Sequence, residues 1–273
     1  MTSGDSSRPS AKPPTSQWVD GDCSRQSAAL PTSLWVVGIV VALPEELSTL
    51  TGHKPAQGEC LAIADNILLA YSGAGPINAG KSANFLIGKG VDGLISWGCA
   101  AALSSDLNPG DLVIPEQILS EQRLAFSTDK AWLQHLRQCL LPEKLTLTTG
   151  SLAESSRIVA DSGEKQLTYR QTGAVALDME SAAVIKAAQQ ANIPCLAIRA
   201  IVDPAGMDLP RAVVQSLNAQ GRTELPKLLR FLLTHPWEIP ALIKLGLNFN
   251  AARKTLKIVA KQLNILIDFK NRA

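Results

Sequence analysis

The sequence contains few of the residues that bind metals. Its 273 residues include only three histidines, none of them close to another in the chain. The five cysteines are widely spaced and form no CxxC pair. Zinc and similar metals need several nitrogen or sulfur ligands, usually at short spacing. We therefore expect no metal site, and we expect the cysteines to be reduced thiols, as in a cytoplasmic protein.

The chain also lacks a strong excess of charge and a long apolar run. The formal net charge is +2, which gives no reason to expect nucleic-acid binding. The apolar run at residues 34–43 is too short to cross a bilayer, and Pro44 ends it. No charged segment followed by an apolar core precedes it, so a secretory signal is not predicted.

The length and composition of the chain suit one α/β domain of ordinary size. Hydrophobic residues make up 46% of the chain, which is enough for a sizeable core. Residues 1–33 are rich in Ser, Pro, Thr and Asp, and we expect them to be a disordered leader. Over residues 34–207 strands alternate with helical crossovers, which predicts a three-layer α/β domain with a mostly parallel central sheet. Residues 208–273 predict a helical, basic and amphipathic C-terminal extension.

Apolar runs and turn residues place the expected elements. The expected strands are residues 35–42, 61–64, 67–71, 91–97, 112–116, 145–149 and 193–202. The expected helices begin near residues 45 and 178, and cover 76–89, 130–139, 226–235, 240–250 and 251–266. The rest of the stretch from 119 to 173 shows no clear pattern.

Two acidic residues occupy informative places in the segment 176–203. Glu180 stands at the start of a crossover helix, and Asp203 ends a nearly unbroken apolar strand. Such a strand is typical of a parallel sheet that is covered on both faces. Ligands of open α/β sheets bind beyond the carboxyl ends of the strands. The pair suits a reaction that needs one proton donor and one carboxylate that binds hydroxyl groups.

The motifs around these acids resemble those of a known superfamily. Residues 178–181 (Asp-Met-Glu-Ser) and 199–203 (Arg-Ala-Ile-Val-Asp) resemble the nucleoside phosphorylases and the methylthioadenosine/adenosylhomocysteine nucleosidases. Further matches follow the family's order at residues 38–46, 72–79, 97–103 and 109–111. The resemblance covers roughly residues 34 to 205. It implies cleavage of a nucleoside N-glycosidic bond without a cofactor, with inorganic phosphate as a possible co-substrate, in a homo-oligomer.

The resemblance makes Asp203 the candidate general acid. A departing purine is a poor anion, so an acid that protonates it lowers the barrier, and such help is worth roughly 10²–10⁴-fold. In the family, the aspartate at this place protonates N7 of adenine. It must be desolvated to hold a proton near neutral pH. The alternative is an aspartate that caps the turn before Pro204.

The Met-Glu pair of the same motif implies ribose binding. Glu180 would accept hydrogen bonds from the 2′- and 3′-hydroxyls, and Met179 would pack on the sugar unless it is a core residue. Asp178 fits better as an acid at a helix N-terminus. Arg199 is expected to be a buried structural arginine that pairs with carbonyls or a carboxylate. Purine contacts are expected from the backbone near Ala153 and Glu154.

The acceptor of the ribosyl group stays open between water and phosphate. Glu46 matches the glutamate that activates water in the hydrolytic members, although an exposed first-turn glutamate is the alternative. The backbone N–H groups of Gly73, Gly75, Gly98 and Cys99 could instead bind phosphate or ribose. Related enzymes often carry serine at the position of Cys99. No arginine lies near the first-strand turn, where hexameric phosphorylases carry one.

The C-terminal part resembles one branch of the family, the hopanoid-associated phosphorylases. The matches are residues 209–210, 218–222, 235–236 and 239–242. They imply adenosylhopane as the substrate, in hopanoid biosynthesis, with release of adenine. From Glu224 to the end there are nine Lys/Arg against three Asp/Glu. The expected helix 251–266 either docks on the core or lies on the inner, anionic membrane surface; its apolar stripe is Ala252, Leu256, Val259, Leu263 and Leu266.

Two other functions compete with this hypothesis. One is a soluble nucleosidase for methylthioadenosine, adenosylhomocysteine or another 5′-substituted adenosine. The other is a non-catalytic protein that binds a nucleoside or a lipid on the same fold.

Overall fold

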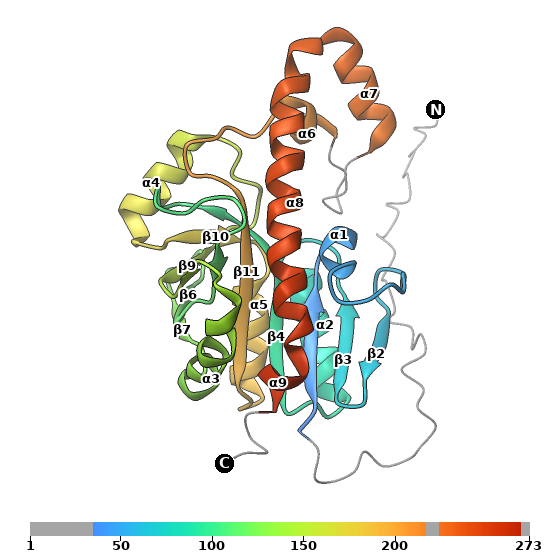
Figure 1. The fold of residues 1–273 in the computed structure, drawn as a ribbon, viewed down its shortest axis with the longest axis vertical. Helices are drawn as coiled ribbons and strands as arrows, with labels where there is room; N and C mark the ends of the chain where they lie inside the picture. The colour runs from blue at the N-terminus through green and yellow to red at the C-terminus, as the bar shows by residue number, and fades with distance from the viewer. Residues whose placement is uncertain (1–34, 217–223, 269–273) are drawn as a thin grey trace, which may run out of the picture.

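The computed structural model describes residues 35–216 and 224–268, and the expected leader at residues 1–33 lies outside them. A mixed sheet of eleven strands forms the middle layer, with helices on both faces (Figure 1). The α/β fold class is therefore confirmed. Six of the strand pairings are parallel, and the antiparallel ones are β2–β3, β4–β10, β5–β11 and β6–β7.

The elements follow one another in this order. The strands are β1 (Val37–Val41), β2 (Cys60–Ala64), β3 (Ile67–Tyr71), β4 (Gly93–Ala102), β5 (Leu112–Val113), β6 (Gln117–Leu119), β7 (Ala125–Ser127), β8 (Leu147–Thr148), β9 (Ser151–Glu154), β10 (Ala176–Asp178) and β11 (Cys195–Asp203). The helices are α1 (Pro44–Leu47), α2 (Pro76–Gly88), α3 (Lys130–Leu140), α4 (Ser162–Thr172), α5 (Ser181–Gln190), α6 (Arg211–Ser216), α7 (Leu225–Thr234), α8 (Ile239–Lys261) and α9 (Leu263–Ile267), with short 3-10 turns η1 (Leu141–Glu143) and η2 (Pro236–Glu238).

The parallel strands at the centre of the sheet decide where the site lies. β1 pairs in parallel with β3 and β4, and β4 pairs in parallel with β11. The carboxyl ends of β1, β3 and β11 therefore meet at one edge of the sheet. At this edge lie Glu46 in α1, the Gly73–Gly75 turn and Asp203, the last residue of β11.

Each face of the sheet has its own apolar core, because alternate residues of a strand point to opposite faces. Ile39 of β1 lies in the core beneath α3, α8 and α9. Val40, its neighbour in the strand, lies in the core beneath α2 and α5. Full burial of such a side chain contributes about 1.5–3 kcal/mol. The two cores together hold the three layers in place.

The C-terminal helices differ from the expectation in one important respect. The expected boundary between residues 240–250 and 251–266 does not exist, because no helix-breaking residue stands there and α8 runs across it to Lys261. The last residues of the second expected helix lie in α9. The apolar stripe from Ala252 to Leu266 is buried in the core against the sheet. Docking of this stripe on the core is confirmed, and the stripe is unavailable to a bilayer.

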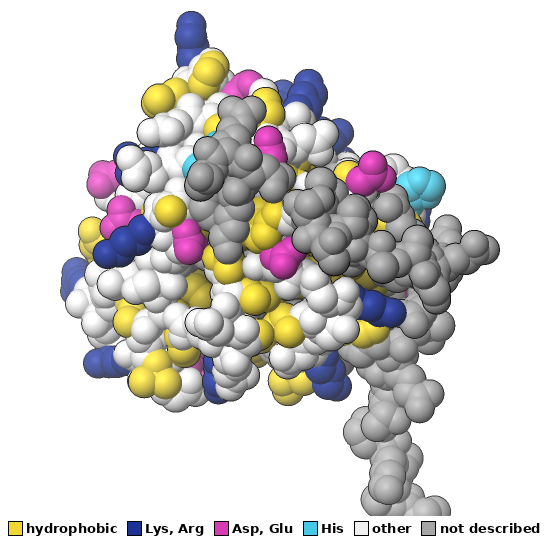
Figure 2. Space-filling model, turned by 90° about the horizontal axis from the view of Figure 1, so that it is seen from below, with side chains coloured by type: hydrophobic (Ala, Val, Ile, Leu, Met, Phe, Trp, Pro, Cys, Tyr) yellow, Lys and Arg dark blue, Asp and Glu magenta, His cyan; other side chains and the backbone are white. Residues whose placement is uncertain are grey.

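The helices α6 and α7 stand beyond the sheet, together with the upper half of α8 (Figure 1). They lie at the end where the strand β11 leads into α6. Figure 2 views the molecule from the opposite end, where positive and negative side chains are interspersed among apolar ones. In the described ranges, no helix combines the length and apolarity that a membrane span requires.

The expectation for the cysteines was wrong at one position. Cys99 and Cys195 are free thiols, but Cys60 is disulfide-bonded. Wide spacing along the sequence therefore does not exclude a disulfide.

Candidate active site

Glu46 is held inside the protein immediately after the first strand. Pro44 begins the four-residue helix α1, which turns Glu46 inward and leaves its side chain only 4% exposed. Its Oε2 accepts a hydrogen bond from the N–H of Leu43 (3.0 Å), and its Oε1 accepts one from the N–H of Cys99 (2.8 Å). Burial raises the pKa of this carboxyl to about 7. The alternative of an exposed first-turn glutamate is therefore wrong.

Gly98 makes room for this carboxylate. A Cβ atom at Gly98 would lie 2.6 Å from Oε1 of Glu46, far inside van der Waals contact. The backbone of Gly98 lies within the regular strand β4, so its conformation does not require glycine. Glycine is needed there because the side chain of Glu46 approaches so closely.

Glu180 reaches across to the turn that precedes α2. It is the N-cap residue of α5, and its Oε1 accepts a hydrogen bond from the N–H of Gly75 (2.8 Å). Gly75 has a φ of +95°, which side-chain-bearing residues rarely adopt. The pKa of Glu180 is raised to about 8. Burial has the larger effect, and the nearby negative charge of Asp178 adds to it. The partly exposed Met179 lies next to it.

A buried arginine lies beneath both glutamates. Arg199 donates through Nε to Oδ2 of Asp178 (2.7 Å) and through a terminal nitrogen to Oγ of Ser96 (2.6 Å). Its positive charge lowers the pKa values of Glu46 and Glu180 against the effect of burial. Asp178 also accepts from the N–H and the hydroxyl of Ser181. Arg199 and Asp178 therefore have the structural roles expected of them.

Asp203 ends β11, four residues beyond Arg199. Its Oδ2 forms an ion pair with Nζ of Lys165 (2.7 Å). Its Oδ1 is buried and has no hydrogen-bond partner among the described residues. Burial raises the pKa of Asp203 to about 6, against the opposing effect of Lys165. The carboxylate is thus paired with a lysine, in place of the expected alternative of a turn cap before Pro204.

The remaining candidates lie around these acids. Gly73, with a φ of +78°, precedes Gly75 in the turn between β3 and α2. Ala153 and Glu154 end β9, and Glu154 is the register partner of Asp178 in β10. The predicted purine contacts therefore lie at the end of β9, and the predicted ribose contacts directly follow its neighbour β10. Burial raises the pKa of the Cys99 thiol well above its usual range, so the thiol stays neutral.

Two of the predicted phosphate donors are engaged by carboxylates. The N–H of Cys99 donates to Glu46, and the N–H of Gly75 donates to Glu180. An anion at either N–H would lie against a carboxylate group. Like charges at such short range repel, most strongly where water is excluded.

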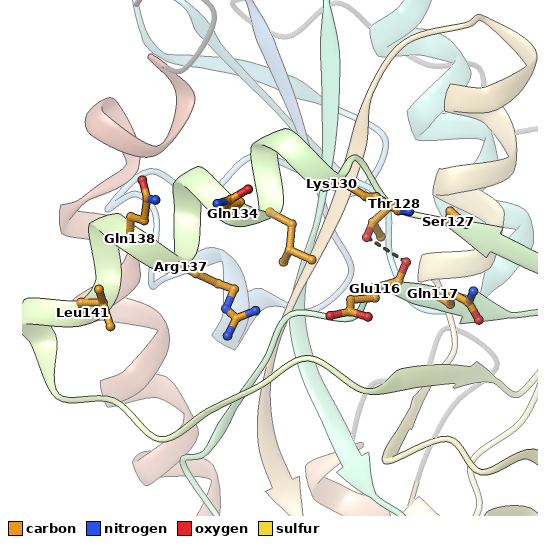
Figure 3. Close-up of a pocket in the computed structure, with 10 residues that line it drawn as sticks. Glu116, Gln117, Ser127, Thr128, Lys130, Gln134, Arg137, Gln138 and Leu141 are labelled. Carbon is orange, nitrogen blue, oxygen red and sulfur yellow. Dashed lines mark hydrogen bonds between the residues drawn. The ribbon is translucent and has the colours of Figure 1, made fainter.

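A cleft among the described residues lies elsewhere. It has a volume of about 680 Å³ and is bordered by α3, β6 and β7, with Arg137 and Glu116 facing each other across it (Figure 3). None of Glu46, Glu180 and Asp203 lines it. It takes no part in the chemistry described below. The described residues also contain no group of three or more His, Cys, Asp or Glu side chains suited to a metal ion.

Comparisons with known proteins agree with this geometry. Residues 36–233 match the family model of the Phosphorylase superfamily. The 5′-methylthioadenosine/S-adenosylhomocysteine nucleosidase of Staphylococcus aureus (strain JH9) is 25% identical over 196 residues, which is 61% of this chain and 86% of that protein.

Solved structures share the fold at lower identity. The Helicobacter pylori 5′-methylthioadenosine/S-adenosylhomocysteine nucleosidase with butyl-thio-DADMe-Immucillin-A matches with a TM-score of 0.63 and 19% identity, over 86% of this chain and 98% of that one. The native futalosine hydrolase of the same organism matches with a TM-score of 0.62 and 19% identity, over 85% and 97%. The chain therefore belongs to the phosphorylase superfamily, which confirms both the resemblance of its motifs and the expectation of an enzyme that cleaves nucleoside N-glycosidic bonds.

Proposed function

We propose that this protein cleaves the N-glycosidic bond of an adenine nucleoside and releases adenine. The observation that carries the proposal is a set of three carboxyls at one edge of the sheet, the buried Glu46 and Asp203 and the half-buried Glu180, each with a raised pKa. Perturbed acids of this kind gather at catalytic sites. Because each group has a different hydrogen-bonding environment, each can have a different role.

Asp203 is the proposed general acid. Its Oδ2 is occupied by Lys165, so the proton for N7 of the purine is carried by Oδ1, which has no other partner among the described residues. Protonation of the base turns a poor leaving anion into a neutral molecule. The backbone of Ala153 and Glu154, at the end of β9, would contact the purine.

Glu180 and Met179 are proposed to hold the ribose. A carboxyl group that accepts hydrogen bonds from both hydroxyls orients the sugar, and in its ionised form it stabilises the positive charge that develops there. Glu46 is proposed to activate the attacking water, since its raised pKa makes it a useful base near neutral pH. Water is favoured over phosphate because Glu46 and Glu180 already occupy the N–H groups of Cys99 and Gly75.

The proposed substrate is adenosylhopane, a nucleoside with a large lipid as its 5′-substituent. The motifs after residue 208 support it, as does a group of exposed apolar side chains on the helices beyond the site. We call this group the hairpin surface; it consists of Leu229 and Leu233 of α7, Trp237 of η2, and Ile239, Ile243 and Leu247 of α8. Its two helical stripes repeat every fourth residue, so each shares one helix face.

The hairpin surface is the proposed contact with an anionic membrane at the cytoplasmic side. Leu233 is 86% exposed and Trp237 is 68% exposed, and tryptophan favours the boundary between lipid and water. Nearby basic residues, such as Arg230 and Lys244, complement anionic headgroups. We also propose a homo-oligomer, as the resemblance of the motifs implies.

A second candidate is a soluble nucleosidase for small 5′-substituted adenosines. The names of the S. aureus and H. pylori relatives favour it. The two candidates differ in the 5′-group that the site accepts.

The test is adenine release from adenosylhopane in liposomes, with and without phosphate, beside methylthioadenosine. Release from the lipid substrate without phosphate is expected, and it should disappear in Asp203→Asn. A strict requirement for phosphate would overturn the role of Glu46. Release from methylthioadenosine alone would replace the lipid substrate with the second candidate, and binding without release would leave a non-catalytic protein.

A further inference from the structure

Lys165 is a buried lysine that none of the recognised motifs contains. It lies in α4, and its side chain has no exposed surface. Its Nζ contacts three oxygen atoms: Oδ2 of Asp203 (2.7 Å), the carbonyl of Met207 (2.7 Å) and the carbonyl of Pro204 (3.1 Å). An ammonium group has three donors, so each one has a partner.

This environment explains why a charge is tolerated there. An isolated ammonium group inside a protein is costly, and burial normally drives it to the neutral form. Here a carboxylate and two carbonyl dipoles replace the lost water. All three acceptors belong to one short segment, residues 203–207, which follows β11 directly.

We propose that Lys165 is a positioning residue that fixes the carboxyl of Asp203 and leaves only Oδ1 to reach the substrate. The inference rests on the proposed function, because it assumes that Asp203 is the general acid. A carboxylate on a short side chain can rotate and exchange its oxygens. An ion pair at 2.7 Å to one oxygen, held by a lysine that two carbonyls also anchor, prevents this exchange.

The lysine also opposes protonation of the acid. Its charge lowers the pKa of Asp203, while burial raises it to about 6. Lys165 therefore limits how high this pKa rises and sets the pH at which the acid loses its proton. The other charged group that acts on Asp203 is Asp208, which has the opposite effect.

A purely structural role is the alternative. The segment after β11 is also tied to α4 by other bonds, since the N–H of Ser162 donates to Asp208 (2.8 Å) and the N–H of Leu209 donates to the carbonyl of Ala160 (2.8 Å). These bonds do not involve Lys165. Removal of its charge should therefore leave the segment largely in place.

The test compares Lys165→Met with Lys165→Arg, and with Arg170→Met as a control, in the full chain. Arg170 is exposed on the same helix. We expect Lys165→Met to lower kcat tenfold or more with little change in KM. We also expect the alkaline limb of its pH profile to move to higher pH, because loss of the positive charge raises the pKa of Asp203. Lys165→Arg should restore part of kcat, and Arg170→Met should behave as the wild type.

A double variant keeps the test decisive if Lys165→Met does not fold. Lys165→Met combined with Asp203→Asn removes both buried charges together. If the lysine acts through Asp203, the double variant should retain the residual rate of Asp203→Asn. A further loss of rate in the double variant, or an unchanged pH profile in a folded Lys165→Met, would overturn the inference. If Asp203→Asn alone were fully active, the proposed general acid would fail, whatever the lysine variants did.

Discussion

The carboxylate of Glu46 lies 2.8 Å from the backbone nitrogen of Cys99. It fills the space that a side chain at Gly98 would otherwise take. The two segments are 53 residues apart in sequence and meet because β1 and β4 are parallel neighbours. A glycine of β4 and a catalytic candidate therefore form one structural unit.

Gly98→Ala should disrupt this unit without unfolding the protein. The new methyl group would overlap with Oε1, and the end of the glutamate side chain can move away. We expect kcat to fall at least tenfold, as measured by adenine release, because a small displacement of a catalytic group is costly. Gly80→Ala in α2 is the matched control, since its added methyl would meet its nearest neighbour at an ordinary 3.7 Å. Equal activity of the two variants would show that the position of Glu46 is unimportant.

The pH dependence of kcat/KM should be bell-shaped. Glu46 must be deprotonated to act as a base, and Asp203 must be protonated to act as an acid. Because the pKa of Glu46 (about 7) lies above that of Asp203 (about 6), only a minority of the molecules carry both groups in the required form. Activity should be highest between about pH 6 and 7 and fall on both sides of this range. Glu46→Gln should remove the acidic limb from any residual activity; a limb that persisted would belong to another group.

The origin of these pKa values shows what the sequence could and could not predict. Strand ends and the Met-Glu motif placed Glu180 and Asp203 correctly, because local apolar patterns reveal parallel strands and crossover helices. Lys165 escaped prediction, since α4 has a weak apolar pattern and nothing in it indicates a long-range partner. The same limit applies to the burial of Leu256, which depends on contacts with segments that are distant in sequence.

Glu180→Gln should weaken ribose binding and alter the pH dependence of stability. The folded pKa of about 8 lies above the ordinary value of 4.5, so the folded state binds the proton more tightly than the unfolded state. The stability due to this group is present below pH 4.5 and is lost as the pH rises through 8. The variant should therefore have a higher Tm than the wild type at pH 9, and the difference should shrink near pH 5. Thermal unfolding at the two pH values checks this, and a Tm below that of the wild type at pH 9 would contradict it.

The hairpin surface should bind anionic vesicles. Its six apolar side chains project from α7, η2 and α8, at the end of the molecule beyond the carboxyl edge of the sheet (Figure 1). Replacing Leu233 and Trp237 together by serine should reduce co-sedimentation with vesicles of anionic phospholipid at least tenfold. The reason is that about 25 cal/mol of favourable transfer free energy is lost for each Å² of apolar surface that no longer enters the lipid. Cleavage of methylthioadenosine, if the site accepts it, should not change, since neither residue is among the proposed catalytic groups.

Leu141→Ser provides the control for this experiment. Leu141 is 75% exposed, but it lies in η1, after α3 and apart from the hairpin. If both variants lost vesicle binding equally, general surface hydrophobicity would be responsible. If the hairpin variant kept its vesicle binding but changed its mass in sedimentation equilibrium, the surface would join two copies of the chain. Loss of vesicle binding in the hairpin variant alone would place the membrane at the end of the molecule where Asp203 and Glu46 lie, and a lipid-linked nucleoside would then have a short path from the bilayer to both.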